Sequence, residues 1–372
     1  MKKQTKRIVA SVTAMLLLFS YFCIAVSAAE SDFEWAEKDG NAVITKYVGT
    51  NKEVNVPDTL SGLPVTEIGE DAFGYTYIEK IELPDTIEKI GAHAFRGCNF
   101  TFFEIPAKVT EISDYTFEWC YLLEDIRMHN GIKSIGTQAF KDCDAFKEFV
   151  IPDSVEKLGD AVFYSCSGLE SIVFPENIEE IPLYTFFCCM NLKNVEFHNG
   201  ITSIGEAAFN QCTALERIEL PAELTLIGSR AFGICKSLKE IEIPESVEVI
   251  EQGAFRECDA LEKIVINNPN CNIYDDVLTI HQSATIYGAK GSEAEKYADK
   301  YNRDFAELKM RILGDVDGNF NITAADARIA LRISARLHIP DATQKTFADM
   351  DKNGKVTAAD ARKILRIAAQ LD

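Results

Sequence analysis

The sequence predicts an α/β solenoid of short parallel strands, followed by a small all-α module that binds calcium. Three observations carry this prediction. Phenylalanine recurs nine times, at intervals of 22, 22 and then six times 23 residues. Cysteine follows three residues after each of these phenylalanines except the first. Near the end of the chain, two acidic loop-helix units repeat with an offset of 34 residues. A chain of 372 residues is long enough for both parts.

The first residues have the organisation of a secretory leader. A basic start precedes an uncharged run from Ile8 to Val26, and small residues follow at once. This order predicts a signal peptide over 1–29, cleaved after Ala28 or Ala29. A retained membrane anchor is the alternative, because 19 uncharged residues nearly span a bilayer. We expect a secreted, extracellular protein that has no membrane segment after cleavage.

Composition and charge restrict the class of partner. Hydrophobic residues make up 47% of the chain and charged residues 26%, which is typical of a folded globular protein. The formal net charge is −20, and loss of the leader with its four basic residues leaves 34 bases against 58 acids, a charge of −24. Nucleic acids and anionic membranes bind proteins that have a basic face. We therefore expect neither as a partner.

The phased repeat over 56–266 predicts a solenoid, because one unit of 22–23 residues cannot bury its own apolar side chains and must stack on its neighbours. Each copy contains a short alternating run that predicts one parallel strand per turn. We expect about nine or ten repeats, between an N-terminal cap over 30–55 and a C-terminal cap and linker over 267–312. The residues expected to point into the core are Ile81, Phe103, Ile126, Phe149, Ile172, Val195, Ile218, Ile241 and Ile264.

Eight cysteines occupy one position of successive repeats, and two interpretations remain open. Stacked cysteines would lie close enough for disulfides, but their Cβ vectors would run parallel, which does not suit disulfide geometry. We favour buried free thiols, which pack as small hydrophobic side chains. A zinc site is disfavoured, because the chain has no C-x-x-C pair and only five histidines. Cys188 and Cys271 lie outside the column and stay unassigned.

The repeat resembles the BspA-like leucine-rich repeats, on the pattern LEKIEIP-x-SV-x-x-IG-x-x-AF-x-x-C. The resemblance extends over about residues 33–308. The segment 56–73 is similar to the first repeat of that family, and 266–305 is similar to its closing cap. His129 and His198 depart from the pattern, because proline is usual there. The resemblance implies an α/β leucine-rich-repeat solenoid in a surface or secreted protein that binds a protein, host or matrix ligand.

The segment 313–372 contains two loops with oxygen-bearing side chains at matching positions. Calcium takes roughly six to eight hard oxygen ligands, and this spacing can wrap them around one ion. Two alternatives are an acidic turn that only caps a helix and a paired EF-hand, which normally has Glu at position 12 instead of Asp. The expected metal ligands, with position 7 acting through its backbone carbonyl, are Asp315, Asp317, Asn319, Asn321, Thr323 and Asp326 in the first loop and Asp349, Asp351, Asn353, Lys355, Thr357 and Asp360 in the second.

These two units together resemble a type I dockerin. Dockerins attach proteins to cohesin modules of scaffold proteins in cellulosome-like assemblies, so the resemblance implies two Ca²⁺ ions, a cohesin partner and an association with polysaccharide catabolism. The similar halves imply that cohesin could bind in either of two orientations. Phe320 stands where the second loop has Gly354, so we predict weaker calcium binding by the first loop. The cohesin-binding positions of the family map to Ala324, Ala325, Leu331, Arg332 and Arg336 and to Ala358, Ala359, Leu365, Arg366 and Gln370.

The surface of the repeats offers the candidates for ligand binding. An outward column beside the strands is mostly acidic, with Val150, Val173 and Val265 among the acids. Aromatic residues follow the repeating phenylalanine on successive turns. They could form a platform for a sugar ring or a protein partner, or could pack only against their own turns. The candidate ligand-binding residues are Trp119, Tyr121, Tyr164 and Phe187.

No catalytic motif stands out: the sequence has no nucleophile elbow, metalloprotease helix or glycine-rich phosphate loop. We therefore expect a secreted, non-catalytic recognition protein. Its repeats would bind a protein or glycan ligand, and its calcium-dependent dockerin would attach it to a cohesin-bearing scaffold. Two alternatives remain, namely a carbohydrate-binding accessory subunit of a polysaccharide-degrading complex and an unrecognised hydrolase. Affinity for insoluble polysaccharide would distinguish the first, and turnover of glycans or peptides would distinguish the second.

Overall fold

The repeats and the C-terminal module have separate hydrophobic cores. The structure is a computed structural model, and it describes residues 28–308, 313–317, 321–340 and 342–370. The predicted leader is therefore outside the described residues up to residue 27, as is the predicted linker over 309–312. In the described part of the chain, no helix combines the length and apolar character that crossing a bilayer requires.

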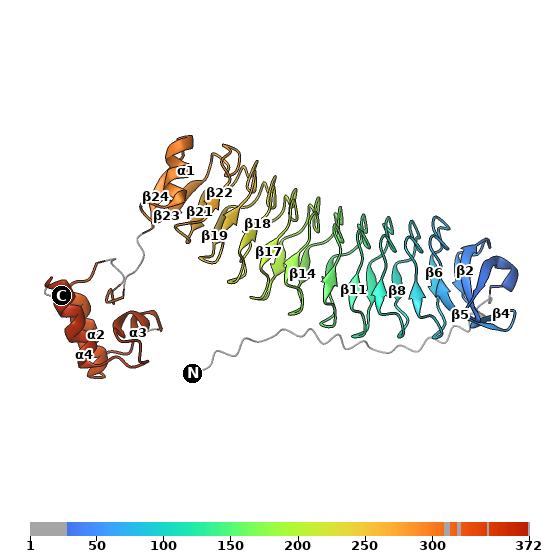
Figure 1. Cartoon of the computed structure of the whole chain (residues 1–372), viewed down its shortest axis with the longest axis horizontal. Helices are drawn as coiled ribbons and strands as arrows, with labels where there is room; N and C mark the ends of the chain where they lie inside the picture. Colours follow the sequence, from blue (N-terminus) through green and yellow to red (C-terminus); the bar gives the residue numbers. More distant parts are fainter. Residues whose placement is uncertain (1–27, 309–312, 318–320, 341, 371–372) are drawn as a thin grey trace, which may run out of the picture.

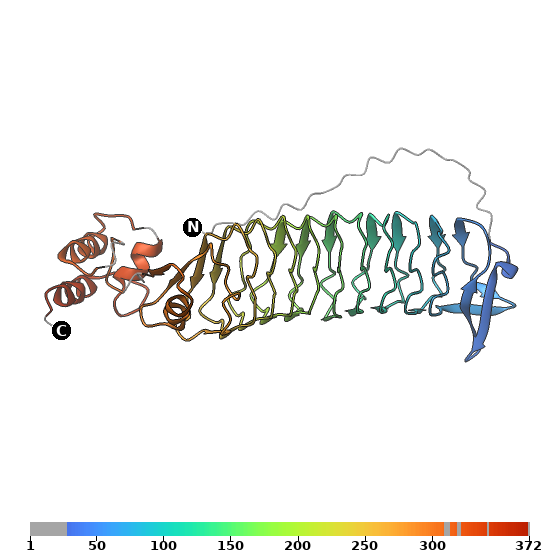
Figure 2. The same ribbon diagram turned by 90° about the horizontal axis from the view of Figure 1, so that it is seen from above.

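The repeats wind into an elongated solenoid with two short strands in most turns (Figure 1 and Figure 2). A first row of strands begins in the predicted N-terminal cap and continues through the predicted alternating runs: β3 (Glu53–Asn55), β6 (Lys80–Glu82), β8 (Phe102–Glu104), β10 (Asp125–Arg127), β12 (Glu148–Val150), β14 (Ser171–Val173), β16 (Asn194–Glu196), β19 (Glu240–Ile243) and β21 (Lys263–Ile266). The predicted run around Ile218 forms no strand, although Ile218 is buried as predicted. A second row, not anticipated from the sequence, consists of β7 (Lys89–Ile90), β9 (Glu111–Ile112), β11 (Ser134–Ile135), β13 (Lys157–Leu158), β15 (Glu180–Ile181), β17 (Ser203–Ile204), β18 (Leu226–Ile227), β20 (Val249–Ile250) and β22 (Asn272–Ile273). Hydrogen-bonded turns, not helices, connect the rows around the repeating phenylalanines.

Parallel pairing in the first row confirms the predicted direction of the strands. Phe103 of β8 pairs with Ile126 of β10, and Phe149 of β12 pairs with Ile172 of β14. The central residue is buried between two exposed neighbours in β8, β10 and β12, as the alternation predicts. Ile81 is half-buried at the equivalent position of β6. Val195 is half-buried, although it occupies the same inward position.

The repeating phenylalanines stack in one column along the solenoid. Tyr47 of the N-terminal cap begins the column, with its ring centroid 5.5 Å from that of Phe73. From Phe73 to Phe255, successive centroids lie 5.2–5.8 Å apart and the ring planes differ by at most 25°. All nine phenylalanines are completely buried. An interior ring is therefore covered on both faces only when a neighbouring turn is present on each side.

The repeated cysteines are free thiols that bond to the neighbouring turn. Cys166 Sγ donates to the carbonyl oxygen of Phe140 at 3.0 Å. The equivalent contact measures 3.0–3.3 Å in all eight copies. Burial raises the pKa of the Cys258 thiol to about 12, so it remains a protonated donor. The eight cysteines of the column confirm the prediction of free thiols. Cys188 and the buried Cys271, which the sequence left unassigned, are free thiols as well.

Each turn around a repeating phenylalanine holds two residues with positive φ, two positions before and two positions after it. Glycine occupies these positions only as Gly97 and Gly253, whereas Trp119 (φ 62°) and Ile234 (φ 60°) adopt the same left-handed conformation. This conformation costs free energy for residues other than glycine. Hydrogen bonds to the next turn hold it, as when Trp119 N–H donates to the carbonyl of Lys141 at 2.8 Å.

Charges of alternating sign lie beside the first row of strands. They occupy one position on seven successive turns: Glu124, Lys147, Glu170, Lys193, Glu216, Lys239 and Glu262. Ion pairs join Lys193 to Glu170 at 2.8 Å and Lys239 to Glu216 at 2.7 Å. These pairs are exposed, so each contributes little free energy. The alternation nevertheless keeps like charges off neighbouring turns, where they would destabilise the pairing.

An antiparallel hairpin closes the N-terminal end. The cap contains a 3₁₀ helix (Glu30–Asp32), β1 (Phe33–Lys38), β2 (Asn41–Tyr47), β4 (Thr59–Leu60) and β5 (Leu63–Ile68). β2 pairs in parallel with β5, and β5 pairs with β7, so the hairpin continues the second row. Glu67 of β5 forms ion pairs with Lys38 at 3.0 Å and Lys89 at 3.2 Å. Burial alone would raise the pKa of Glu67, but hydrogen bonds from the two lysines hold it below its ordinary value.

The C-terminal cap extends the first row by two strands. β23 (Thr285–Gly288) pairs with β21 and with β24 (Phe305–Glu307), and α1 (Glu293–Tyr301) connects these two cap strands. Ser292 Oγ caps α1 by accepting the N–H of Glu295. Val265, which is predicted to face outward, is only 7% exposed. It lies between Glu242 and Tyr287 in the pairing register, and these longer side chains flank it.

The C-terminal module consists of three helices around a small core. They are α2 (Ala324–Ser334), α3 (Ala342–Ala348) and α4 (Ala358–Ala368). α2 and α4 pack against one another, and Val316, Ala330, Met350 and Ile364 are among the buried residues between the elements. The core contains no aromatic residue among its described buried members. The two predicted loops precede α2 and α4 and position their side chains in equivalent ways.

Candidate functional site

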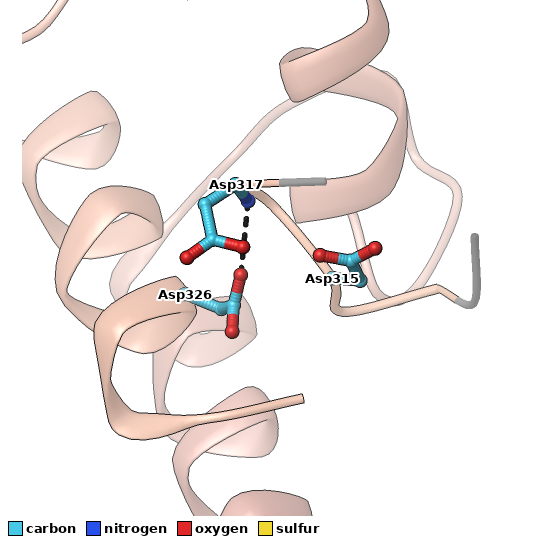
Figure 3. A group of neighbouring side chains, drawn as sticks. All are labelled: Asp315, Asp317 and Asp326. Carbon is cyan, nitrogen blue, oxygen red and sulfur yellow. Dashed lines mark hydrogen bonds between the residues drawn. The ribbon is translucent and has the colours of Figure 1, made fainter. Parts of the chain in front are cut away.

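Each loop of the C-terminal module gathers three carboxylates. The clusters are Asp315, Asp317 and Asp326 in the first loop (Figure 3), and Asp349, Asp351 and Asp360 in the second. Within a cluster, one oxygen of each carboxylate lies within 4.8 Å of the others. The exposed fraction is 0% for Asp315 and Asp326, 7% for Asp349 and 2% for Asp360. Buried carboxylates this close together repel one another unless a cation or donors compensate their charge.

Asp326 holds the first loop through backbone donors. Its Oδ1 accepts the N–H of Asp317 at 2.9 Å (Figure 3). The same oxygen accepts the N–H of Val316 at 2.7 Å. Its Oδ2 accepts the N–H and the hydroxyl of Thr323, both at 2.8 Å. Burial alone would raise the pKa of Asp326, but the hydrogen bonds from Asp317, Thr323 and Val316 hold it below its ordinary value. The carboxylate is therefore ionised at neutral pH and available to a cation.

The second loop repeats this arrangement. Asp360 Oδ1 accepts the N–H of Met350 at 2.9 Å, and Oδ2 accepts the N–H and hydroxyl of Thr357 at 2.8 and 2.7 Å. Asp349 closes the turn from the other side, accepting the N–H groups of Asn353 at 3.1 Å and Gly354 at 2.6 Å. Gly354 has a φ of 82°, the left-handed conformation that the turn requires there. The loop is folded around its own carboxylates.

The donor set of each loop fits a hard divalent cation. All the clustered ligand atoms are carboxylate oxygens, which suit calcium, magnesium or manganese better than softer transition metals. The loop spacing favours calcium, because backbone and side-chain oxygens can add to the three carboxylates. Six of the twelve predicted ligands therefore lie in the two clusters. Asn319 and Phe320 are outside the described residues, so the predicted weakness of the first loop stays a prediction.

The remaining predicted ligands are placed less directly. Thr323 Oγ1 accepts the N–H of Ala325 at 3.2 Å and so caps α2, and Thr357 caps α4 in the same way. A metal contact at position 9 would then pass through a water, as is common in calcium loops. Asn353 Oδ1 accepts the N–H of Lys355 at 2.9 Å within its loop. Asn321 is exposed at the end of the first loop.

The ten predicted cohesin-binding residues are all exposed. Leu331 and Leu365 hold equivalent places in α2 and α4, with exposed fractions of 51% and 49%. Arg336 (φ 60°) and Gln370 (φ 54°) end the two helices in the same left-handed conformation. The two halves therefore present similar faces, and their contact with cohesin stays a prediction.

The predicted aromatic candidates lie in a column with cations between the rings. The guanidinium carbon of Arg96 lies 4.7 Å from the ring centroid of Tyr75 and 5.9 Å from that of Trp119. On the next turn, Lys141 Nζ lies 5.4 Å from the centroid of Trp119 and 5.9 Å from that of Tyr164. Sequence reasoning missed these two cations. Their spacing could have revealed them, because each directly follows a repeating phenylalanine, as Tyr164 does.

The column continues to Phe187, whose ring stacks on Tyr164 at 4.8 Å. Trp119 Nε1 also donates to Asp142 Oδ2 at 3.0 Å. The ring faces of Trp119 and Tyr164 are thus already in contact with neighbours, and mainly ring edges remain for a ligand. Tyr121 is 51% exposed beside this column. Ligand binding by these residues stays a prediction.

Two family models match the chain. The model described as "BspA type Leucine rich repeat region (6 copies)" matches residues 66–189 and 158–285, which together are more than half of the chain. The model described as "Dockerin type I domain" matches residues 313–366. No curated protein matches the chain.

Similar solved structures are bacterial proteins. The T. pallidum leucine-rich repeat protein is 26% identical with a TM-score of 0.47, and the match covers 51% of this chain and 90% of that one. A leucine-rich repeat protein from Bacteroides ovatus is 23% identical with a TM-score of 0.40, over 74% and 98%. The pneumococcal vaccine antigen PcpA is 16% identical with a TM-score of 0.37, over 75% and 98%. Because these TM-scores are below 0.5, the family models carry the assignment.

Proposed function

The chain belongs to the BspA-type leucine-rich repeat family and ends in a type I dockerin domain, and from this premise we propose that it is a secreted, non-catalytic recognition protein held on a cohesin-bearing scaffold. The repeats bind a protein or glycan ligand, and the dockerin attaches them to the scaffold when its loops hold two Ca²⁺ ions. The observation that carries this proposal is the pair of carboxylate clusters, each in front of an exposed helix.

The metal would act on the fold of the dockerin. Asp326 and Asp360 each connect a loop to the first turn of the following helix, so a cation bound to either carboxylate also fixes the start of that helix. Leu331 and Leu365 lie on those helices and supply apolar surface for a partner. Calcium binding and cohesin binding are thus coupled through the same helices.

The repeats supply a long surface and no recognised catalytic group. Their large buried core is built from repeated side chains, and the residues that vary between turns lie on the outside. This division is typical of repeat proteins that bind extended partners. The predicted secretory leader supports an extracellular place of action. The acidic charge that remains after the leader is removed supports a role away from nucleic acids.

A capture experiment tests the proposal. The mature chain is used as bait for surface and secreted proteins of the source organism, in calcium and in chelator. We expect a cohesin-containing protein to be captured in calcium, and to be lost in chelator and with the double variant Asp326→Ala/Asp360→Ala. A matched control, Glu196→Ala/Glu219→Ala, removes two exposed acids of the solenoid and should capture cohesin normally.

Single substitutions test the two predicted cohesin-binding faces, on α2 and on α4, one at a time. Leu331→Asp and Leu365→Asp each place a charge on one helix only. If either face can bind, each single variant keeps cohesin binding and the double variant loses it. Capture of cohesin that is unchanged by chelator and by the aspartate variants would contradict the proposed calcium-dependent docking.

A further inference from the structure

Among the described strands, the first row lacks a ladder at three places, namely between β6 and β8, between β10 and β12, and between β16 and β19. Hollows in the surface lie at the first and the last of these three places. β6 pairs with β3 and β8 pairs with β10, so within these described turns no strand ladder joins β6 to β8. Residues 216–220, between β16 and β19, form no strand. A hollow of about 740 Å³ lies between β6 and β8, and hollows of about 430 and 220 Å³ lie on either side of residues 216–220.

The hollow between β6 and β8 combines an exposed aromatic ring with paired charges. Phe102 is 42% exposed, and Ile81 is half-buried on the neighbouring turn. Arg127 lies over Phe102, with its guanidinium carbon 5.3 Å from the ring centroid, and its Nη1 is 3.1 Å from Glu104 Oε2. Lys80 Nζ pairs with Glu82 Oε1 on the opposite wall at 2.7 Å.

The charges of the hollow select against ionic ligands. Its lining contains the four acids Glu79, Glu82, Asp85 and Glu104 but only the two bases Lys80 and Arg127. Lys52, outside the lining, pairs with Glu79 at 2.6 Å, so each base near the hollow already has a carboxylate partner and Asp85 is the acid in excess. An anionic ligand would meet this net negative charge, and an ionic ligand of either sign would have to compete with the existing ion pairs. Hydroxyl groups can donate to the carboxylates and accept from the guanidinium without changing the charge. A ligand with many hydroxyls and an apolar ring face fits both the polar walls and Phe102.

From this geometry we propose that the first-row face of the solenoid binds a neutral polysaccharide, anchored at Phe102 in the hollow between β6 and β8; this rests on the recognition role proposed for the repeats and names its ligand class. The two smaller hollows lie further along the same row of strands. A linear polymer can occupy successive hollows on one face, whereas a single sugar would occupy one.

The test is affinity gel electrophoresis of the mature chain in the presence of hydroxyethylcellulose, xyloglucan, glucomannan or polygalacturonate. We expect at least one neutral polysaccharide to retard the protein, and polygalacturonate not to retard it. Phe102→Ala should weaken the binding by about tenfold, whereas Phe102→Tyr, which keeps the ring, should retain it. Val48→Ala removes a 45% exposed side chain from the N-terminal cap, outside the first row and the hollows, and serves as the matched control.

Several outcomes would overturn the proposal. These are no retardation by any neutral polysaccharide, retardation that Phe102→Ala leaves unchanged in a folded variant, and stronger binding to polygalacturonate. Binding of an extended peptide that Phe102→Ala abolishes, without glycan binding, would assign the hollow to a protein ligand instead. Cohesin capture is measured on the same samples. Absence of glycan binding with intact cohesin capture would contradict only the proposal about the hollow. Absence of cohesin capture would contradict only the proposed docking function.

Discussion

In the solenoid, each turn is held by the next through stacked phenylalanines and thiol–carbonyl hydrogen bonds, whereas in the dockerin the loops are held by carboxylates that accept their own backbone N–H groups. Phe163 contacts a ring on the turn before it and on the turn after it, at 5.8 and 5.5 Å. Asp326 instead gathers donors from one loop and one helix start. The stability of each solenoid turn therefore depends on the adjacent turns. The stability of the dockerin loops depends on compensation of the carboxylate charges.

Because of this difference, we expect different treatments to unfold the two regions. Apolar burial and neutral hydrogen bonds hold the solenoid, and neither needs an ion. Clusters of buried carboxylates organise the dockerin, and its described core consists of small and aliphatic side chains. A chelator should thus act on one region, and a cavity in the aromatic column should act on the other.

The largest expected effect is the unfolding of the dockerin without metal. We predict that the double variant Asp326→Ala/Asp360→Ala, or chelation of the wild type, abolishes protection of α2 and α4 amides and leaves the solenoid protected. The reason is that both loops lose the cation or the carboxylate that connects them to a helix. Hydrogen exchange followed by peptide mass spectrometry measures both regions at once. Equal protection of α2 with and without calcium would contradict this dependence.

The next effect concerns thiol protection, which reports only on the solenoid because no cysteine follows Cys271. The thiolate is the reactive form, and burial raises the pKa of Cys98 and Cys258 to about 12. We predict that the ladder thiols react with iodoacetamide orders of magnitude more slowly in the folded protein than in urea, with chelator making no difference. Cys188, which is only half-buried, should react first. Faster labelling of the buried thiols in chelator would couple the two regions and contradict their independence.

A cavity in the aromatic column should lower the stability of the solenoid alone. We predict that Phe163→Ala destabilises the solenoid by about 3–5 kcal/mol, because it removes a completely buried ring from the middle of the column. Denaturant unfolding of the solenoid measures the loss. Calcium binding by the dockerin, followed by calorimetry, serves as the control and should not change. A cost below about 1 kcal/mol would show that the neighbouring turns collapse into the space.

The smallest effect concerns one charge in the N-terminal cap. We predict that Glu67→Gln destabilises the solenoid by less than about 1 kcal/mol at pH 7 and has no effect at strongly acidic pH. The pKa of Glu67 is lowered in the folded state, so its stabilising contribution is present above the unfolded-state pKa and is lost as the pH falls through the folded-state pKa. Thermal unfolding of both proteins from pH 7 to pH 3 measures the difference. A constant difference across that range would contradict the assignment to ionised Glu67.

Much of the fold was predictable because the same physical requirement recurs in every turn. The phenylalanine and cysteine positions revealed the column and the free thiols, and the alternation revealed the inward residues of the first row. The second row escaped notice, because a two-residue strand such as β9 is too short to show alternation. The left-handed residues also escaped notice, because side chains such as Ile234 give no glycine signal and are held there by hydrogen bonds to the next turn.

The candidate sites were predictable only where ligands are spaced along one segment. The acidic loops could be found because Asp349, Asp351 and Asp360 lie within one loop and one helix turn. The hollow at Phe102 could not be found, because it lies between β6 and β8, where the strand ladder is missing. Whether neighbouring strands pair depends on the packing of several turns, which no single repeat encodes.

The alternating charges beside the first row have a consequence for how such a chain can change its length. Deletion of the turn that carries Glu170 would bring Lys147 and Lys193 onto adjacent turns, where like charges repel. Deletion of two successive turns would restore a lysine beside a glutamate. Over the seven turns from Glu124 to Glu262, the unit that can be duplicated or lost without an electrostatic penalty is therefore a pair of turns. The charge pattern repeats every two turns, whereas the phenylalanine repeats every turn.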